Sequence, residues 1–185
     1  GYFGGKRNLG LAYEKGYGTE KNEKLAIEWY QKAALQGDWI SQEKLGMNYE
    51  FGVGVPINIE KAKEWYLKAA DQGSTFSQMK LGMLYLVEDN IAGFGVLMKA
   101  AEGNEKVAQY ILGTMYFTGE KVAKDKDKGL YWLEKSGQNN YKDAMFALGM
   151  LYDKGEHVKQ DFSKSYFWFE KLANTKDPRG ENQLG

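Results

Sequence analysis

Apolar and small residues recur along this chain with the spacing of an amphipathic helix, and the pattern returns five times. In each copy a Leu-Gly pair is followed three residues later by tyrosine, and the glycines recur at intervals of 36, 36, 31 and 36 residues. The five motifs are Leu9-Gly10 with Tyr13, Leu45-Gly46 with Tyr49, Leu81-Gly82 with Tyr85, Leu112-Gly113 with Tyr116, and Leu148-Gly149 with Tyr152. Residues four apart share one helix face, so each motif predicts a first helix, helix A. Because glycine is unfavourable within a helix, we expect these glycines at close helix contacts.

A second helix, helix B, is predicted in each copy around a bulky residue. Tryptophan stands nineteen residues after four of the glycines, whereas the third copy is five residues shorter and has Val96 in this place. Asn or Asp precedes this position by seven residues, at Asn22, Asn58, Asp89, Asp125 and Asp161. Such residues cap helix N-termini, so helix B should begin there in every copy, including the short one. Small residues three before the tryptophan position, such as Ala26 and Ala62, predict a close-packed contact.

The predicted fold class is therefore all-α, a single array of tandem antiparallel helix pairs. Its repeats span approximately 1–37, 38–73, 74–104, 105–140 and 141–176, with a partial sixth at 177–185. Leu184-Gly185 matches the start of a further motif, so we expect an unfinished helix A there and an array that continues. Arrays usually end in polar capping repeats, and their absence predicts possible end-to-end contacts between array ends.

The motif resembles the Sel1-like repeat, a relative of the tetratricopeptide repeat. The resemblance rests on L-G-x-x-Y, a Gly-rich turn such as Gly52-Val53-Gly54-Val55, and Lys61-Ala62-Lys63-Glu64-Trp65-Tyr66-Leu67-Lys68-Ala69-Ala70 with its following glycine. It covers essentially the whole chain, although the third repeat lacks the Gly-rich turn and the tryptophan. The resemblance implies a right-handed α-solenoid with helix A lining the concave face.

Composition excludes several classes of chemistry. The chain has no cysteine and one histidine, so disulfides, thiolate metal sites and multi-histidine metal sites are impossible. Lys plus Arg and Asp plus Glu both number 25, which disfavours nucleic acid as a partner. No apolar stretch approaches 18 residues, so no membrane insertion is expected. The opening residues lack a signal peptide, but a removed one would leave no trace, so periplasm and cytoplasm both stay open.

Candidate catalytic groups are few, and we expect no enzyme activity and no cofactor. His157 lies in a predicted turn, where a solvated loop residue is the simpler interpretation than a general base. Asp125 and Asp127 alternate with lysines, which is typical of a solvated loop. The tryptophans could form a stacking platform for single-stranded nucleic acid, but their regular position favours a core role.

The groove implied by the resemblance provides the candidate partner-binding surface. By analogy with the tetratricopeptide arrangement, residues at −3, +1, +4 and +5 from each motif glycine face a ligand. The predicted partner-binding residues, chosen from these positions with Phe76 as an extension, are Met47, Phe51, Phe76, Met79, Met83, Leu86, Tyr110, Phe117, Phe146 and Met150. The alternative is that these side chains pack against the next helix A as ordinary core. Exposed and central rings at Phe51 and Phe117 would be hot spots for binding.

These observations favour a protein–protein interaction scaffold or adaptor that holds a protein or peptide partner in its groove. The resemblance also admits a bacterial immunity protein that neutralises a secreted toxin or phospholipase. A hydrolase acting on cell-wall-related substrates is the less favoured alternative, given the single histidine and the absence of cysteine. A purely architectural role, with array ends in contact, is a further alternative.

Overall fold

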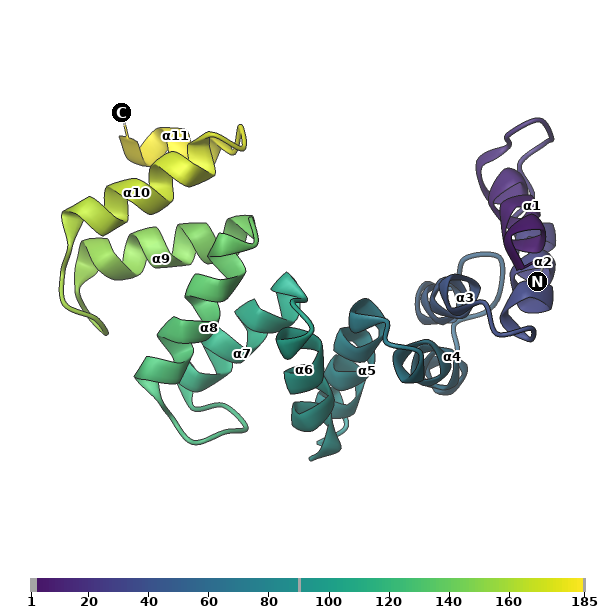
Figure 1. Cartoon of the computed structure of the whole chain (residues 1–185), viewed down its shortest axis with the longest axis horizontal. Helices are drawn as coiled ribbons and strands as arrows, with labels where there is room; N and C mark the ends of the chain where they lie inside the picture. Colours follow the sequence, from purple (N-terminus) through teal and green to yellow (C-terminus); the bar gives the residue numbers. More distant parts are fainter. Residues whose placement is uncertain (1–2, 90, 185) are drawn as a thin grey trace. The chain divides into compact units, whose positions relative to one another are not determined.

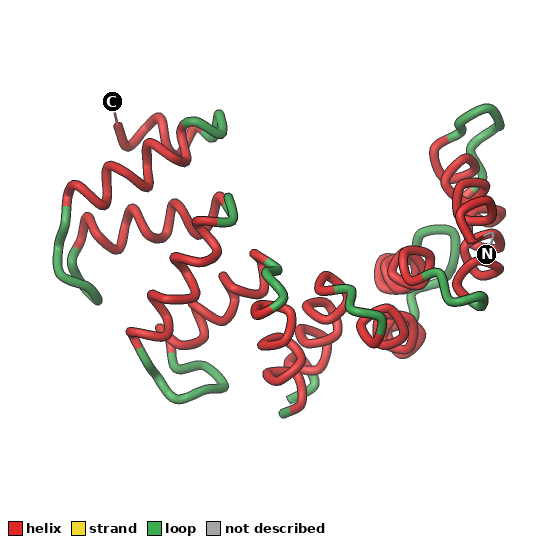
Figure 2. The backbone as a smooth tube through the Cα atoms, in the orientation of Figure 1, coloured by secondary structure: helices red, strands yellow, loops and turns green. Residues whose placement is uncertain are grey.

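Helices account for all of the regular structure that can be described. The computed structural model describes residues 3–89 and 91–184, and this part of the chain contains eleven helices and no strand (Figures 1 and 2). The helices are α1 (Phe3–Lys15), α2 (Glu23–Ala34), α3 (Trp39–Phe51), α4 (Ile59–Asp71), α5 (Thr75–Val87), α6 (Ala92–Glu102), α7 (Lys106–Thr118), α8 (Lys126–Gln138), α9 (Lys142–Lys154), α10 (Phe162–Ala173) and α11 (Pro178–Leu184). Odd-numbered helices are helix A and even-numbered helices are helix B. The predicted all-α class is confirmed.

Side-chain caps start helix B in four of the five repeats, as predicted. The cap oxygen accepts a hydrogen bond from the backbone N–H three residues later at Asn22, Asn58, Asp125 and Asp161. The prediction for the short repeat is wrong, because α6 begins only at Ala92. Asp89 has a φ of 55° and still belongs to the turn, whereas an N-cap residue needs extended backbone.

The chain divides into two compact bodies, Gly1–Val96 and Leu97–Gly185, with the boundary inside α6. In the N-terminal body, α1 packs on α2 and α3 packs on α4 as helical hairpins (Figure 1). A Cβ added to Gly46 would lie 2.6 Å from two ring carbons of Tyr66, and Gly10 meets Tyr30 in the same way. The motif glycine therefore makes room for the bulky residue that follows the tryptophan of helix B.

The same design organises the C-terminal body, where the hairpins are α7 with α8 and α9 with α10. Gly113 lies against Leu133, and Gly149 lies against Phe169. The predicted close contacts are thus confirmed at these glycines as well.

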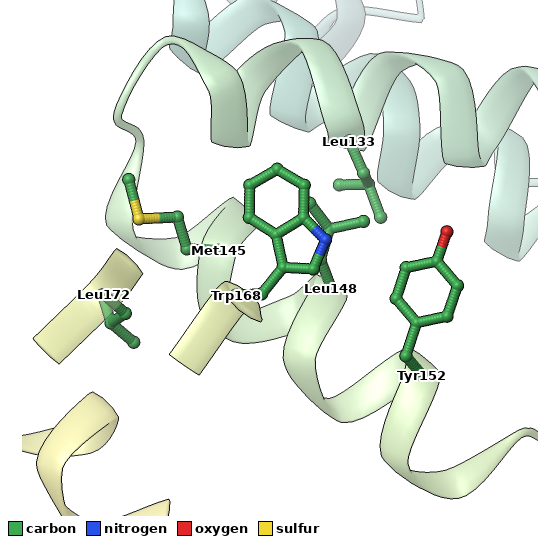
Figure 3. Packing of buried hydrophobic residues seen from close by; sticks show 6 residues of the cluster. All are labelled: Leu133, Met145, Leu148, Tyr152, Trp168 and Leu172. Carbon is green, nitrogen blue, oxygen red and sulfur yellow. The ribbon is translucent and has the colours of Figure 1, made fainter. Parts of the chain in front are cut away.

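The tryptophan of helix B joins neighbouring repeats. In the C-terminal body, Trp168 from α10 lies among buried side chains of α8 and α9, including Leu133 and Leu148 (Figure 3). Gly137 of α8 leaves space for its ring, because a Cβ there would lie 2.8 Å from the indole. Trp65 likewise packs against a cluster centred on Tyr30 and Leu45. The core interpretation of the tryptophans accounts for both residues.

Candidate functional site

The ten residues predicted to face a ligand differ in exposure. Phe51 and Met83 are exposed, with 55% and 39% of their surface accessible. Half-buried side chains belong to Met47, Phe76, Leu86, Tyr110, Phe117, Phe146 and Met150. Met79 is only 4% exposed, so it is a core residue and its expected place on the binding surface is corrected.

The −3 register explains why part of the prediction identified packing residues. In the N-terminal body, Arg7 forms an ion pair of 2.7 Å with Asp38, which caps the next helix A. Glu43 accepts a hydrogen bond of 2.6 Å from Ser74, which caps α5. Tyr110 contacts the start of its next helix A in the C-terminal body, with its ring centroid 5.2 Å from that of Tyr141. This register therefore connects successive helices A.

Other predicted residues lie at the edge of the core. Met47 and Phe76 pack against the buried cluster around Tyr66. Phe117 packs against the cluster around Trp168, and its ring comes so close to Gly129 that a Cβ there would lie 2.8 Å away. Phe117 therefore combines partial exposure with a packing role, unlike Phe51.

Five apolar residues, four of them exposed and one half-buried, occupy the helix A face of the N-terminal body, and we call them the N-terminal strip. They occupy the +1 and +5 positions of successive helices A and are Leu11, Met47, Phe51, Met83 and Val87. The ion pairs Lys44–Glu14 and Lys80–Glu50 join α1 to α3 and α3 to α5, so the three helices lie side by side. Val87 is 83% exposed. Exposed apolar side chains gathered on one face of adjacent helices are a candidate partner site.

A charged network lies beside this strip. The hydroxyl of Tyr66, which is fully buried, donates a hydrogen bond of 2.6 Å to Glu50, and Lys80 pairs with the same carboxylate at 2.8 Å. Burial and the hydrogen bond to Glu50 raise the pKa of Tyr66 well above its usual range. The carboxylate of Glu50 is therefore already paired from both sides.

The preceding repeat contains an equivalent network. Tyr30 donates to Glu14 at 2.6 Å, and Lys15 and Lys44 lie at 2.9 and 3.6 Å from that carboxylate. Partial burial raises the pKa of Glu14, but the hydrogen bonds from Tyr30 and Lys15 and the nearby positive charges outweigh it, so the net pKa is lowered. Glu14 is consequently an ionised and paired group.

The predicted apolar residues on the helix A face of the C-terminal body are all half-buried. The hydroxyl of Thr114 donates to the carbonyl of Ile111 within its own helix, which leaves it less available to a partner. A shallow cavity of about 220 Å³ lies on α9, lined by Ala147, Met150, Leu151, Lys154 and Glu156. Met150 therefore borders a hollow.

A larger hollow of about 800 Å³ lies in the N-terminal body. It is lined by Lys21, Asn22, Glu23, Lys24, Gly52, Gly54, Val55 and Pro56. Gly54 has a φ of 72°, and a Cβ on it would lie 2.8 Å from the carbonyl oxygen of Glu23. The hollow is thus a gap between two stacked turns, and Gly54 is needed for their close approach.

The candidate catalytic residues do not form a reactive arrangement in the described part of the chain. His157 is exposed, with its ring centroid 5.9 Å from that of Phe117. Asp125 caps α8 and pairs with Lys128 at 3.2 Å. No group of three or more metal-ligating side chains occurs among residues 3–89 and 91–184. No helix in these ranges is long and apolar enough to cross a membrane.

One exposed surface was missed by the sequence reasoning. The C-terminal body exposes three aromatic side chains on α10, namely Phe162, Tyr166 and Phe167. The aromatic run at 166–169 was the available signal. The helix B pattern considered only Trp168 of this run; Trp168 and Phe169 are buried, whereas Tyr166 and Phe167 are exposed.

Glycine-centred hairpins stacked through tryptophan define this protein as a helical repeat array. The family model of the Sel1 repeat matches residues 5–38, 39–74, 106–141 and 142–174. The chain therefore belongs to the Sel1 repeat family, and the resemblance seen in its sequence is confirmed. The shortened third repeat lies between the matched segments.

Solved structures share the fold. A protective antigen of uropathogenic Escherichia coli with an SLR fold is 28% identical and superposes with a TM-score of 0.85 over 100% of this chain, which spans 40% of the length of that chain. A Sel1 repeat protein from Oxalobacter formigenes is 30% identical with a TM-score of 0.84, covering 94% of this chain and 73% of that one. An immunity protein from Pseudomonas aeruginosa, 18% identical with a TM-score of 0.52, covers 95% and 82% and shows the fold alone. A search of curated proteins found no match.

Proposed function

We propose that this protein binds a protein partner through its helix A face and that the N-terminal strip is the principal binding surface. The Sel1 repeat fold suggests a protein-interaction scaffold. The observation that most supports this binding surface is the exposure of Phe51, a large apolar ring at the centre of the strip with 55% of its surface accessible. Its removal from water on binding would be favourable, and central aromatic residues commonly dominate interface energies.

The C-terminal body has a secondary role in this proposal. Its predicted rings are half-buried, and Phe117 and Phe146 pack against the core cluster. Met150 and its small cavity would add apolar contact area. We expect no catalytic activity from either body.

A peptide-display selection on the folded protein tests the proposal. Selected peptides are measured for binding to the wild type, to Phe51→Ala and to Leu67→Ala, whose side chain is also exposed but lies on helix B. Loss of an aromatic hot spot costs about 2 kcal/mol, so Phe51→Ala should weaken binding about 30-fold. Leu67→Ala should have no effect, and thermal unfolding of both variants should match the wild type.

A folded double variant, Phe51→Ala with Met83→Ala, can refute the proposal. If it binds the selected peptides as tightly as the wild type does, the N-terminal strip is not the binding surface. The exposed aromatic face of α10 would then be the next surface to mutate. Because immunity proteins share this fold, a secreted toxin is one class of partner to which the same variants apply.

A further inference from the structure

Phe51 has one ring face covered by a cation of its own protein. The ammonium nitrogen of Lys80 lies 4.8 Å from the ring centroid, while the same nitrogen is 2.8 Å from Glu50. Only 17% of the Lys80 side chain and 15% of the Glu50 side chain are exposed. The ion pair therefore holds the cation against the ring, and the exposed part of Phe51 is what a partner can reach.

Two methionines of the N-terminal strip share the helix A face with this ring. Met47 lies four residues before Phe51 on α3 and so shares its helix face. Met83 lies three residues after Lys80 on α5, at the same register as Met47, and is 39% exposed. Thioether groups are polarizable and make favourable contacts with aromatic rings. The ring and the two methionines together provide an adaptable apolar binding surface.

The electrostatics of the N-terminal strip disfavour a cationic occupant. A cation beneath one face draws on the negative potential of the ring, which weakens its attraction for a second cation on the other face. The carboxylates beside the strip, Glu14 and Glu50, are both hydrogen-bonded to tyrosine and paired with lysine. A cationic partner residue would lose hydration without gaining a free carboxylate.

We infer that the N-terminal strip selects partner segments that place an uncharged aromatic side chain on Phe51, between Met47 and Met83. This inference rests on the proposed function and specifies its partner. Offset-stacked and edge-to-face aromatic pairs are stabilised beyond the area they bury, and two sulfur contacts add to this preference. An aliphatic side chain would gain the burial but not the aromatic contacts.

Methyl NMR of protein labelled at its methionines tests the inference directly. The chain has seven methionines, of which Met145 is fully buried in the other body and serves as an internal control. The probes are N-acetyl-tryptophanamide, N-acetyl-leucinamide and N-acetyl-argininamide. The aromatic probe should shift the Met47 and Met83 methyls saturably, with a Kd about threefold or more below that of the leucine probe. The arginine probe should produce no saturable shift, and Met145 should not move.

Two variants separate the role of the aromatic ring from non-specific hydrophobic binding. Phe51→Leu keeps an apolar side chain and should reduce the preference for tryptophan over leucine to about onefold. Leu67→Ala on helix B should leave the preference intact. The inference is overturned if the leucine probe binds wild type as tightly as the aromatic probe, or if Met83 stays unshifted by the aromatic probe.

The outcome is distinguishable from failure of the proposed function. If the display-selected peptides require Phe51 for binding but contain no aromatic residue, the aromatic preference is refuted and the proposed binding surface stands. If aromatic probes shift the Met47 and Met83 methyls but the selected peptides bind Phe51→Ala as tightly as wild type, the proposed function is refuted instead.

Discussion

Replacement of Gly46 by alanine should destabilise the protein, although alanine is the better helix former. Gly46 lies within α3, and the added Cβ would lie 2.6 Å from Cδ1 and Cε1 of Tyr66 and 3.0 Å from Cγ. The ring cannot easily move away, because it is fully buried and its hydroxyl is bonded to Glu50 at 2.6 Å. The substitution therefore forces either the ring or the helix to shift.

The magnitude follows from two opposing terms. Overpacking a filled core costs about 1–3 kcal/mol, whereas alanine in place of glycine gains about 1 kcal/mol in a helix. Because the ring is held at both ends, we expect the upper part of the first range and a net loss of about 1–2 kcal/mol. Leucine at this position should be worse, since it adds three more carbons to the same contact.

Urea unfolding followed by far-UV circular dichroism measures the effect. The matched control is Gly95→Ala in α6, where an added Cβ has no atom within 4 Å. That variant should be more stable by up to about 1 kcal/mol, through helix propensity alone. If Gly46→Ala proves as stabilising as Gly95→Ala, the close approach of Tyr66 does not constrain this position, and the account of the motif glycine is wrong.

Three further outcomes are expected. Trp168→Ala should cost about 3–5 kcal/mol in an unfolding titration, because it opens a cavity at the centre of the C-terminal cluster. Tyr66→Phe should cost about 1–3 kcal/mol, since it removes a hydrogen bond to the charged Glu50. The hydrogen bond from Arg179 lowers the pKa of Asp177 from 3.8 to about 2. The ionised Asp177 should therefore stabilise α11 fully above pH 4, and this stabilisation should disappear as the pH falls to about 2. Hydrogen exchange of α11 in wild type and Asp177→Asn would measure this, and an identical acid profile for the two proteins would contradict it.

The sequence by itself determined the helices and their closest contacts. Capping by Asn22 or Asp161 depends on a side chain and a backbone N–H only three residues away. The need for glycine at position 46 was visible because the motif recurs with a constant period. Local physics repeated five times is therefore enough to establish the helix pairs, and it failed at Asp89, where the shortened turn changes the backbone conformation.

Tertiary structure decided which of the repeated positions are exposed. Met79 and Met83 lie on one helix and both satisfied the groove pattern, yet one is 4% and the other 39% exposed. The hydrogen bond from Tyr66 to Glu50 and the position of Lys80 over Phe51 likewise join side chains from α3, α4 and α5. Periodicity specifies the face of a helix but not the neighbour that covers each residue, because that cover comes from helices whose approach is set by packing across repeats.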